Sequence, residues 1–277
     1  MTAPVAVTRG AHRCLLKWHR ARRRGSDPVF TGRRIVEGMR AGASVEVDLV
    51  VHGDQGFAVL HNLDLARETT GTGSVRDASA DELRALHLRG NDGAPLPDRV
   101  MLLEDLAALL AREGVDPEAL LQLDYKEDAT VLTPGAIETF ARALGAIAPS
   151  FILSSGDAAS VDLLSRVTPG LRIGYDPCHM GAIDRLRESR DYPGFVATAL
   201  AASPRAEMIY LDHGLIFFAQ DDGFDLIAAF HAAGRRIDAY TLRRADAAGI
   251  AAAERLLALR ADQITTDDPE GMAAALS

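Results

Sequence analysis

Two acidic residues interrupt an otherwise apolar stretch of the chain at residues 44–50, which reads Ser-Val-Glu-Val-Asp-Leu-Val. Its aliphatic and β-branched residues predict a buried strand, in which residues two apart point to the same face. Glu46 and Asp48 are therefore expected side by side, where two carboxylates repel each other and are costly to desolvate. A cation between them would remove both costs, and oxygen ligands suit Mg²⁺ or Ca²⁺. An edge strand whose acids face water is the alternative.

Further residues able to do chemistry stand at the ends of other apolar runs. They are His19, Arg20, His61, Asp124 and Lys126. Three carboxylates would hold a hard divalent cation, and the cation, the Arg and the Lys would neutralise a phosphate. Two imidazoles can supply a general acid and a general base. This combination predicts metal-assisted cleavage of a phosphodiester.

Strand-like runs that alternate with amphipathic helices would position these side chains. Eight runs precede helices, at 14–18, 44–50, 120–125, 151–154, 171–175, 208–211, 236–241 and 263–266. Helices are expected at 31–42, 102–112, 134–148, 158–167, 183–190, 222–233 and 245–259, and a short helix is expected to follow a capping box at 79–82. This order predicts an α/β fold, a (β/α)8 TIM barrel whose working residues lie at the carboxyl ends of the strands.

Two segments are expected outside the regular alternation. After a turn at 53–56, residues 57–60 are predicted to form a small hairpin excursion following the second strand, ending on His61. Residues 1–13 carry little pattern and are expected to be a leader to the first strand. Nothing in the chain suggests a linker, so residues 1–277 are predicted to form a single domain.

Composition excludes several classes of function. The chain of 277 residues has a net charge of −9, which argues against nucleic-acid binding. Cys14 and Cys178 form neither a metal-ligand spacing nor a disulfide framework, which is typical of a reducing compartment. Because the sequence lacks a signal-peptide core and an apolar run of membrane-spanning length, it predicts a cytoplasmic protein without stable membrane insertion.

The polar motifs, taken in order, resemble the glycerophosphodiester phosphodiesterase family. That family's opening reads His-Arg-Gly, Pro-Glu-Asn-Thr, Ile-Glu-x-Asp and Val-x-His-Asp. This chain has His-Arg-Ala at 19–21, Pro-Val-Phe-Thr at 28–31, Val-Glu-Val-Asp at 45–48 and Val-Leu-His-Asn at 59–62. The segments at 65–73 and 264–269 are similar to the family's Leu-x-Arg-Thr-Thr-x-Gly-x-Gly and closing Ile-x-Thr-Asp-x-Pro. The set is specific, although each motif alone is weak.

The resemblance implies a role for each matching residue. Glu46, Asp48 and Asp124 would bind Mg²⁺ or Ca²⁺. His19 and His61 would be the acid–base pair, and Arg20 and Lys126 would hold the phosphate. His19 is preferred to His12 because its spacing to the acidic pair fits the family pattern. The implied reaction splits a small phosphodiester into an alcohol and a phosphomonoester.

The chain departs from the family pattern at several positions. Ala21 replaces Gly, Val29 and Phe30 replace Glu and Asn, Asn62 replaces Asp, and Asp124 replaces Glu. Residues 240–243 read Tyr-Thr-Leu-Arg where the family has Trp-Thr-Val-Asn.

These departures leave two alternative functions open. The Asp-x-Lys at 124–126 is also similar to the spider-venom sphingomyelinase D relatives, so a phospholipase D-like activity on lysophospholipid or sphingomyelin-type substrates is one alternative. A non-catalytic ligand-binding protein on the same scaffold is the other, suggested by the lost polar residues at 29 and 30.

Later strands end in further polar residues. Asp176, Cys178 and His179 follow the fifth strand and could line the same mouth, although such a histidine is more often a loop residue. The best candidates for substrate contact end the sixth strand and are Tyr210, Asp212 and His213. On the seventh strand, Asp238 and Tyr240 are expected to point into the barrel.

Overall fold

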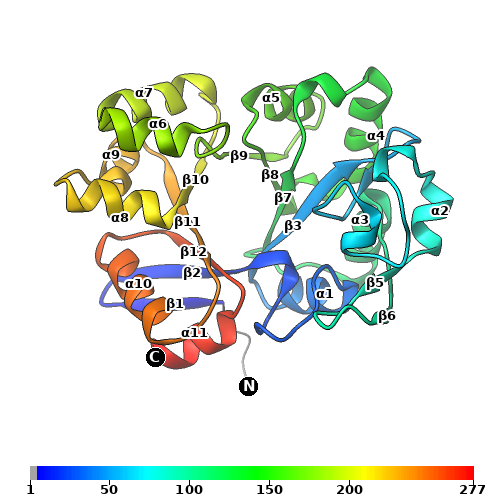
Figure 1. The fold of residues 1–277 in the computed structure, drawn as a ribbon, viewed down its shortest axis with the longest axis horizontal. Helices are drawn as coiled ribbons and strands as arrows, with labels where there is room; N and C mark the ends of the chain where they lie inside the picture. The colour runs from blue at the N-terminus through cyan, green and yellow to red at the C-terminus, as the bar shows by residue number, and fades with distance from the viewer. Residues whose placement is uncertain (1–4) are drawn as a thin grey trace.

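Eight parallel strands close into a barrel that is surrounded by helices (Figure 1). The computed structural model describes residues 5–277. The barrel strands are β2 (His12–Trp18), β3 (Ser44–Val51), β7 (Leu120–Tyr125), β8 (Phe151–Ser154), β9 (Arg172–Tyr175), β10 (Met208–Asp212), β11 (Arg236–Leu242) and β12 (Gln263–Thr266). The predicted TIM barrel is therefore confirmed, since β2 pairs with both β12 and β3 and so closes the ring.

Strand register places acidic residues of β3 and β7 at the same level of the barrel. β3 and β7 pair from Ser44 and Leu120 onward, which sets Asp48 directly beside Asp124. The neighbouring junction is much shorter, because β2 and β3 pair only through Trp18 and Val45.

Helices follow the strands on the outside of the barrel. They are α1 (Gly32–Arg40), α2 (Ala80–Ala85), α3 (Leu103–Glu113), α4 (Pro134–Leu144), α5 (Ala158–Arg166), α6 (Ala182–Ser189), α7 (Tyr192–Ala202), α8 (His213–Asp221), α9 (Leu226–Ala232), α10 (Ala247–Ala258) and α11 (Pro269–Ala275). Side-chain caps fix many of their first turns, as where Ser79 and Glu82 form the expected capping box of α2. Within residues 5–277, no helix combines the length and the apolar character needed to cross a membrane.

Several elements differ from the sequence-based prediction. The presumed leader contains β1 (Ala6–Arg9), which pairs antiparallel with a β2 that begins at His12 rather than at Cys14. Residues 1–4 of that leader lie outside the described residues. The predicted hairpin arm is confirmed but shorter, as β4 (Phe57–Ala58), so His61 lies in a bend beyond it. A second hairpin of β5 (His87–Arg89) and β6 (Pro95–Arg99) was not predicted.

The prediction of a helix at 222–233 is also wrong in its bounds. The chain forms α8 earlier, turns at Asp222 and Gly223, and then forms the short α9. Gly223 has a φ of 85°, a left-handed conformation that suits glycine and ends the first helix. Neither α7 nor α11 was expected, because the near-uniform apolar character of α7 and the shortness of α11 give little periodic signal.

Charged and polar side chains fill part of the barrel interior. Lys17 Nζ lies 2.7 Å from Asp238 Oδ2 and 4.4 Å from the centre of the Tyr210 ring. Thr265 donates its hydroxyl to Asp238 at 2.6 Å, and Lys17 donates to Gln122. Asp238 therefore points into the barrel as predicted, where a buried cation compensates its charge.

Helix α1 packs closely over the short junction between β2 and β3. A Cβ atom placed on Gly38 would lie 2.6 Å from Val45 Cγ2 and 3.3 Å from the Trp18 ring. Since Val45 is a β-branched residue of the barrel wall, it cannot swing aside.

We expect Gly38→Ala to lower the free energy of unfolding by about 1–3 kcal/mol, because the added methyl forces the helix away from the barrel. Denaturant titration would measure the change. Gly25→Ala is the control, since its Cβ would meet only Asp268 Cβ at 3.8 Å in an exposed loop. Equal stability of the two variants would contradict this account of the packing.

Candidate active site

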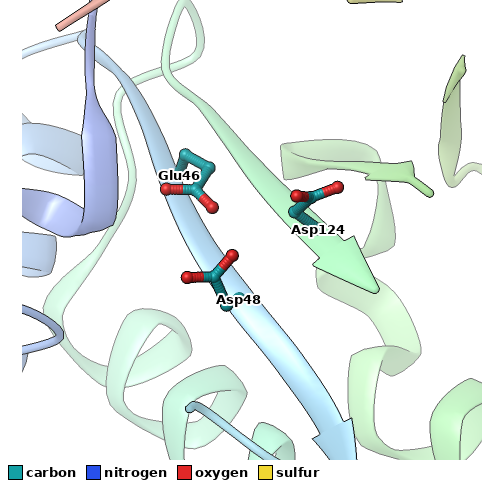
Figure 2. Close-up of side chains that lie close together, drawn as sticks. All are labelled: Glu46, Asp48 and Asp124. Carbon is teal, nitrogen blue, oxygen red and sulfur yellow. The ribbon is translucent and has the colours of Figure 1, made fainter. Parts of the chain in front are cut away.

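Three carboxylates converge at the mouth of the barrel. Glu46 and Asp48 lie on β3 and Asp124 lies on β7, and their side chains face a common space between the strands (Figure 2). One oxygen from each residue lies within 4.8 Å of the others. Glu46 and Asp48 are buried, so the edge-strand alternative, in which these acids face water, is wrong.

Two cationic side chains contact this acidic trio. Lys126 Nζ lies 2.6 Å from Asp48 Oδ1 and also contacts Asp124. Arg20 Nε lies 3.1 Å from Asp48 Oδ2, and the Arg20 backbone N–H donates to Glu46 Oε2 at 2.7 Å. Arg20 has a left-handed backbone conformation with φ of 51°, which turns the chain sharply after β2 and aims this N–H at the acids.

The pKa values of the acids diverge for physical reasons. Burial, followed by repulsion from Asp48, raises the pKa of Glu46 well above its usual value. Burial would also raise the pKa of Asp48, but the charges of Lys126 and Arg20 outweigh it and hold that pKa well below its usual range. Burial would lower the pKa of Lys126, but the surrounding carboxylates, led by Asp124, raise it instead.

The donor set fits a hard divalent cation. All three groups offer carboxylate oxygens, which Mg²⁺ and Ca²⁺ prefer. Both oxygens of Asp48 are buried and lack a partner with hydrogen-bond geometry, although each lies at ion-pair distance from one cationic nitrogen. Buried carboxylate oxygens left in this state are unusual in a native protein, and a bound cation would satisfy them.

His19 lies beside the acids and is oriented by a residue from the far end of the chain. Its Nδ1 atom lies 2.6 Å from Asp267 Oδ1. Because an ionised carboxylate only accepts, Nδ1 carries the proton and Nε2 keeps its lone pair. Burial lowers the pKa of His19 and the contact with Asp267 only partly offsets this, so the imidazole is neutral and can accept a proton.

Asp267 was not assigned a role from the sequence, although it lies inside the closing motif at 264–269. Burial alone would raise the pKa of Asp267. His19 and Arg22 lower this pKa by more than burial raises it, so the carboxylate stays ionised. Arg22 Nη1 lies 3.0 Å from the same Asp267 oxygen. Arg22 therefore contributes to the charge balance around Asp267.

His61 lies in the same pocket and is held by its backbone. The N–H groups of His61 and Asn62 both donate to Glu68 Oε2, at 2.9 and 3.0 Å. Burial lowers the pKa of His61, and Asp48 opposes this shift without cancelling it. The bend at His61 is therefore held by backbone hydrogen bonds.

Asp124 is held by a chain of hydrogen bonds that leads into the barrel interior. Ser154 on β8 donates its hydroxyl to Asp124 Oδ1 at 2.7 Å, and Gln122 donates Nε2 to Ser154 Oγ at 2.7 Å. Gln122 in turn accepts from Lys17 in the barrel interior. Sequence reasoning missed Ser154 because a serine at a strand end carries no distinctive signal by itself.

A pocket of about 180 Å³ brings the predicted residues together. Among those that line it are His19, Arg20, Glu46, His61, Asp124 and Lys126, and Asp48 lies buried beneath. His12 lies at the opposite end of β2, where its ring contacts the Ala261 carbonyl.

The opposite wall of the pocket comes from later strands. It includes Asp176, His179, Tyr240 and Arg243, of which the first three were considered from the sequence. His179 Nε2 lies 2.9 Å from Asp176 Oδ2. Cys178 does not line this pocket, since it is buried and accepts from the Asp212 N–H at 3.5 Å.

Of the three residues at the end of the sixth strand that were expected to contact substrate, one lines the pocket and two do not. Tyr210 lines the pocket, although nearly all of it is buried under Lys17. Asp212 instead caps α8 by accepting the Leu215 N–H at 2.9 Å. His213 Nδ1 contacts the Tyr240 carbonyl at 2.9 Å, so the sequence expectation for Asp212 and His213 is not supported.

Barrel and site together define a class: TIM barrels with an acidic, cation-flanked pocket at the carboxyl ends of their strands. The chain belongs to the glycerophosphoryl diester phosphodiesterase family, whose model matches residues 36–271. That match begins after His19 and Arg20, so it is the geometry above that places these two residues in the pocket with the acids. No curated protein sequence matches the chain.

Solved structures share the fold at low sequence identity. One is a Silicibacter pomeroyi protein assigned to the glycerophosphoryl diester phosphodiesterases, with a TM-score of 0.71 at 22% identity over 96% of this chain and 94% of that one. A glycerophosphodiester phosphodiesterase of Agrobacterium tumefaciens has a TM-score of 0.63 at 21% identity over 95% and 98%. An Oleispira antarctica phosphodiesterase, solved with the product sn-glycerol-3-phosphate, has a TM-score of 0.67 at 18% identity over 94% and 96%.

We expect Glu46→Gln to weaken binding of Mg²⁺ or Ca²⁺ by at least about tenfold, because it removes one charged ligand oxygen from the trio. Isothermal titration calorimetry with each ion would measure this. Glu138→Gln is the control, since Glu138 is exposed on α4. Unchanged affinity in Glu46→Gln would rule out Glu46 as a ligand.

We expect Ser154→Ala to lower the affinity for the cation by about 10–100-fold, since Asp124 would lose the hydroxyl that fixes its carboxylate. Ser165→Ala is matched in size change and sits on α5, outside the pocket. The same titration applies, and a Ser154→Ala protein with parental affinity would show that Asp124 needs no such support.

Proposed function

We propose that this protein hydrolyses small glycerophosphodiesters to an alcohol and a phosphomonoester. The observation that carries the proposal is that two histidines, three carboxylates and two cationic side chains line or underlie one pocket. Family membership supports the substrate class. The product bound to the Oleispira antarctica relative, sn-glycerol-3-phosphate, supports the identity of the phosphomonoester.

The phosphate of the substrate binds against Arg20 and Lys126. Both side chains reach the acidic trio and line the pocket, so they offer positive charge where the diester enters. Glu46, Asp48 and Asp124 would hold Mg²⁺ or Ca²⁺, which when bound supplies charge neutralisation for the phosphate oxygens. With the phosphate oxygens neutralised, the phosphorus is more open to attack by a nucleophile.

The two histidines divide the proton transfers. Water adds to phosphorus while the bond from phosphorus to the leaving alcohol oxygen breaks. One imidazole takes the proton from the attacking water, and the other, in its protonated form, gives a proton to the leaving oxygen. Asp267 fixes the tautomer and orientation of His19, so that Nε2 is the atom that exchanges the proton. The two transfers balance, and the histidines return to their starting states by exchange with solvent.

The pocket's size agrees with a small substrate. A volume of about 180 Å³ accommodates a phosphate with a short polar arm rather than a large head group. We retain a cytoplasmic location for the enzyme as a prediction that agrees with this class of soluble substrate.

We expect His61→Ala to lower kcat for glycerophosphodiester hydrolysis by about 10²–10⁴-fold, because it removes one of the two proton-transfer groups. A metal-supplemented screen of glycerophosphocholine, glycerophosphoethanolamine and glycerophosphoglycerol, with detection of glycerol phosphate, would identify the best substrate and supply the assay.

The matched control is His87→Ala, whose ring contacts the Leu96 carbonyl in the β5–β6 hairpin, outside the pocket. Turnover by His61→Ala at the parental rate would remove this mechanism. Release of free phosphate, instead of a phosphomonoester and an alcohol, would overturn the proposed reaction itself.

A further inference from the structure

One arginine at the catalytic pocket has no ion-pair partner. Arg243 is the first residue beyond β11, so it stands at the carboxyl end of the barrel, and its side chain lines the pocket while remaining exposed. The backbone beside it is fixed, because the Leu242 carbonyl accepts the Asp267 N–H at 3.1 Å. Within residues 5–277, the Arg243 side chain makes neither an ion pair nor a hydrogen bond.

The three other Lys and Arg side chains that line this pocket are all paired. Lys17 Nζ lies 2.7 Å from Asp238 Oδ2 in the barrel interior. Lys126 and Arg20 lie 2.6 and 3.1 Å from the two oxygens of Asp48. Their charges are therefore balanced by acids of the barrel, whereas the arginine beyond β11 carries a charge that no acid of the described chain pairs with.

The phosphate end of the pocket is balanced without this arginine. With its acids ionised, the trio carries three negative charges, and its two cationic partners and a divalent cation would supply four positive charges. The single negative charge of a phosphodiester balances the difference. The Asp267 carboxylate already contacts His19 and Arg22. Arg243 is therefore available to a further anionic group of the ligand.

The position of Arg243 suits contact with an ester arm rather than with the phosphate. Strand β11 lies across the barrel from β3 and β7, which carry the acidic trio (Figure 1). A ligand whose phosphate meets Arg20 and Lys126 would extend an arm toward this wall. A guanidinium binds a carboxylate through two parallel N–H donors. The chain has this arginine where the family pattern described above has Asn, so the feature departs from that pattern.

We propose that Arg243 sets substrate specificity by binding a carboxylate on the alcohol arm of the phosphodiester. The proposal rests on the proposed function for the reaction and for the position of the phosphate. It deepens that function by naming a substrate class, glycerophosphodiesters whose leaving alcohol carries an acidic group. Glycerophosphoserine belongs to this class, and glycerophosphoethanolamine, which lacks only the carboxylate, is its matched comparison.

Binding of O-phosphoserine and O-phosphoethanolamine to the Mg²⁺-loaded protein, measured by calorimetry, tests the contact without turnover. We expect the parent to bind phosphoserine about three- to tenfold more tightly, a modest preference because the guanidinium is exposed to solvent. Arg243→Gln should lose this preference, and Arg243→Lys, which keeps the charge without the paired donors, should retain part of it. Arg244→Gln is the control and should keep the full preference, since Arg244 is exposed but does not line the pocket.

The same proteins are then assayed for kcat/KM with glycerophosphoserine and glycerophosphoethanolamine. Equal binding of the two phosphomonoesters by the parent, or an undiminished preference in Arg243→Gln, would overturn the role of Arg243. A phosphoserine preference that depends on Arg243, without hydrolysis of either diester, would keep this role and overturn the proposed function. Hydrolysis of both diesters without any phosphoserine preference would support the proposed function and overturn the role of Arg243.

Discussion

Mutual repulsion among three clustered carboxylates, two of them buried, is the constraint on which the mouth of this barrel depends. Glu46, Asp48 and Asp124 are brought together by strand register, and no arrangement of the surrounding apolar core could stabilise them alone. Arg20 and Lys126 supply opposing charge within ion-pair distance. In the resulting cluster, the pKa of each group depends on the charges beside it. A cation and a phosphate both require such fixed, balanced charges.

Sequence reasoning was most successful where a local pattern carries the information. Short apolar runs bounded by helices predicted every barrel strand, and period-two spacing placed Glu46 beside Asp48. It failed for β1, α7 and the β5–β6 hairpin, since short or uniformly apolar segments have no clear period. The break between α8 and α9 was missed because both sides of the turn are rich in apolar residues.

The residues that gather in the pocket could be predicted from the sequence, but the residues that support them could not. Acids, histidines and cationic residues at strand ends are visible in the sequence, whereas Asp267 reaches His19 only after the barrel closes. Ser154 became visible as a support of Asp124 only through the pairing of β7 with β8. Such partners are set by tertiary contacts between distant segments, so no local pattern marks them in advance.

The acids also help to hold the barrel closed between β2 and β3. Strands β2 and β3 pair through only one pair of residues. The contacts from Arg20, just beyond β2, to Glu46 and Asp48 on β3 therefore supply much of the interaction between these two strands. Local opening is therefore expected to begin there, and it would separate His19, which follows β2, from the acids on β3 before the rest of the sheet loosens. The same side-chain contacts thus shape the pocket and close the barrel, so the arrangement of the pocket would be lost while most of the core was still intact.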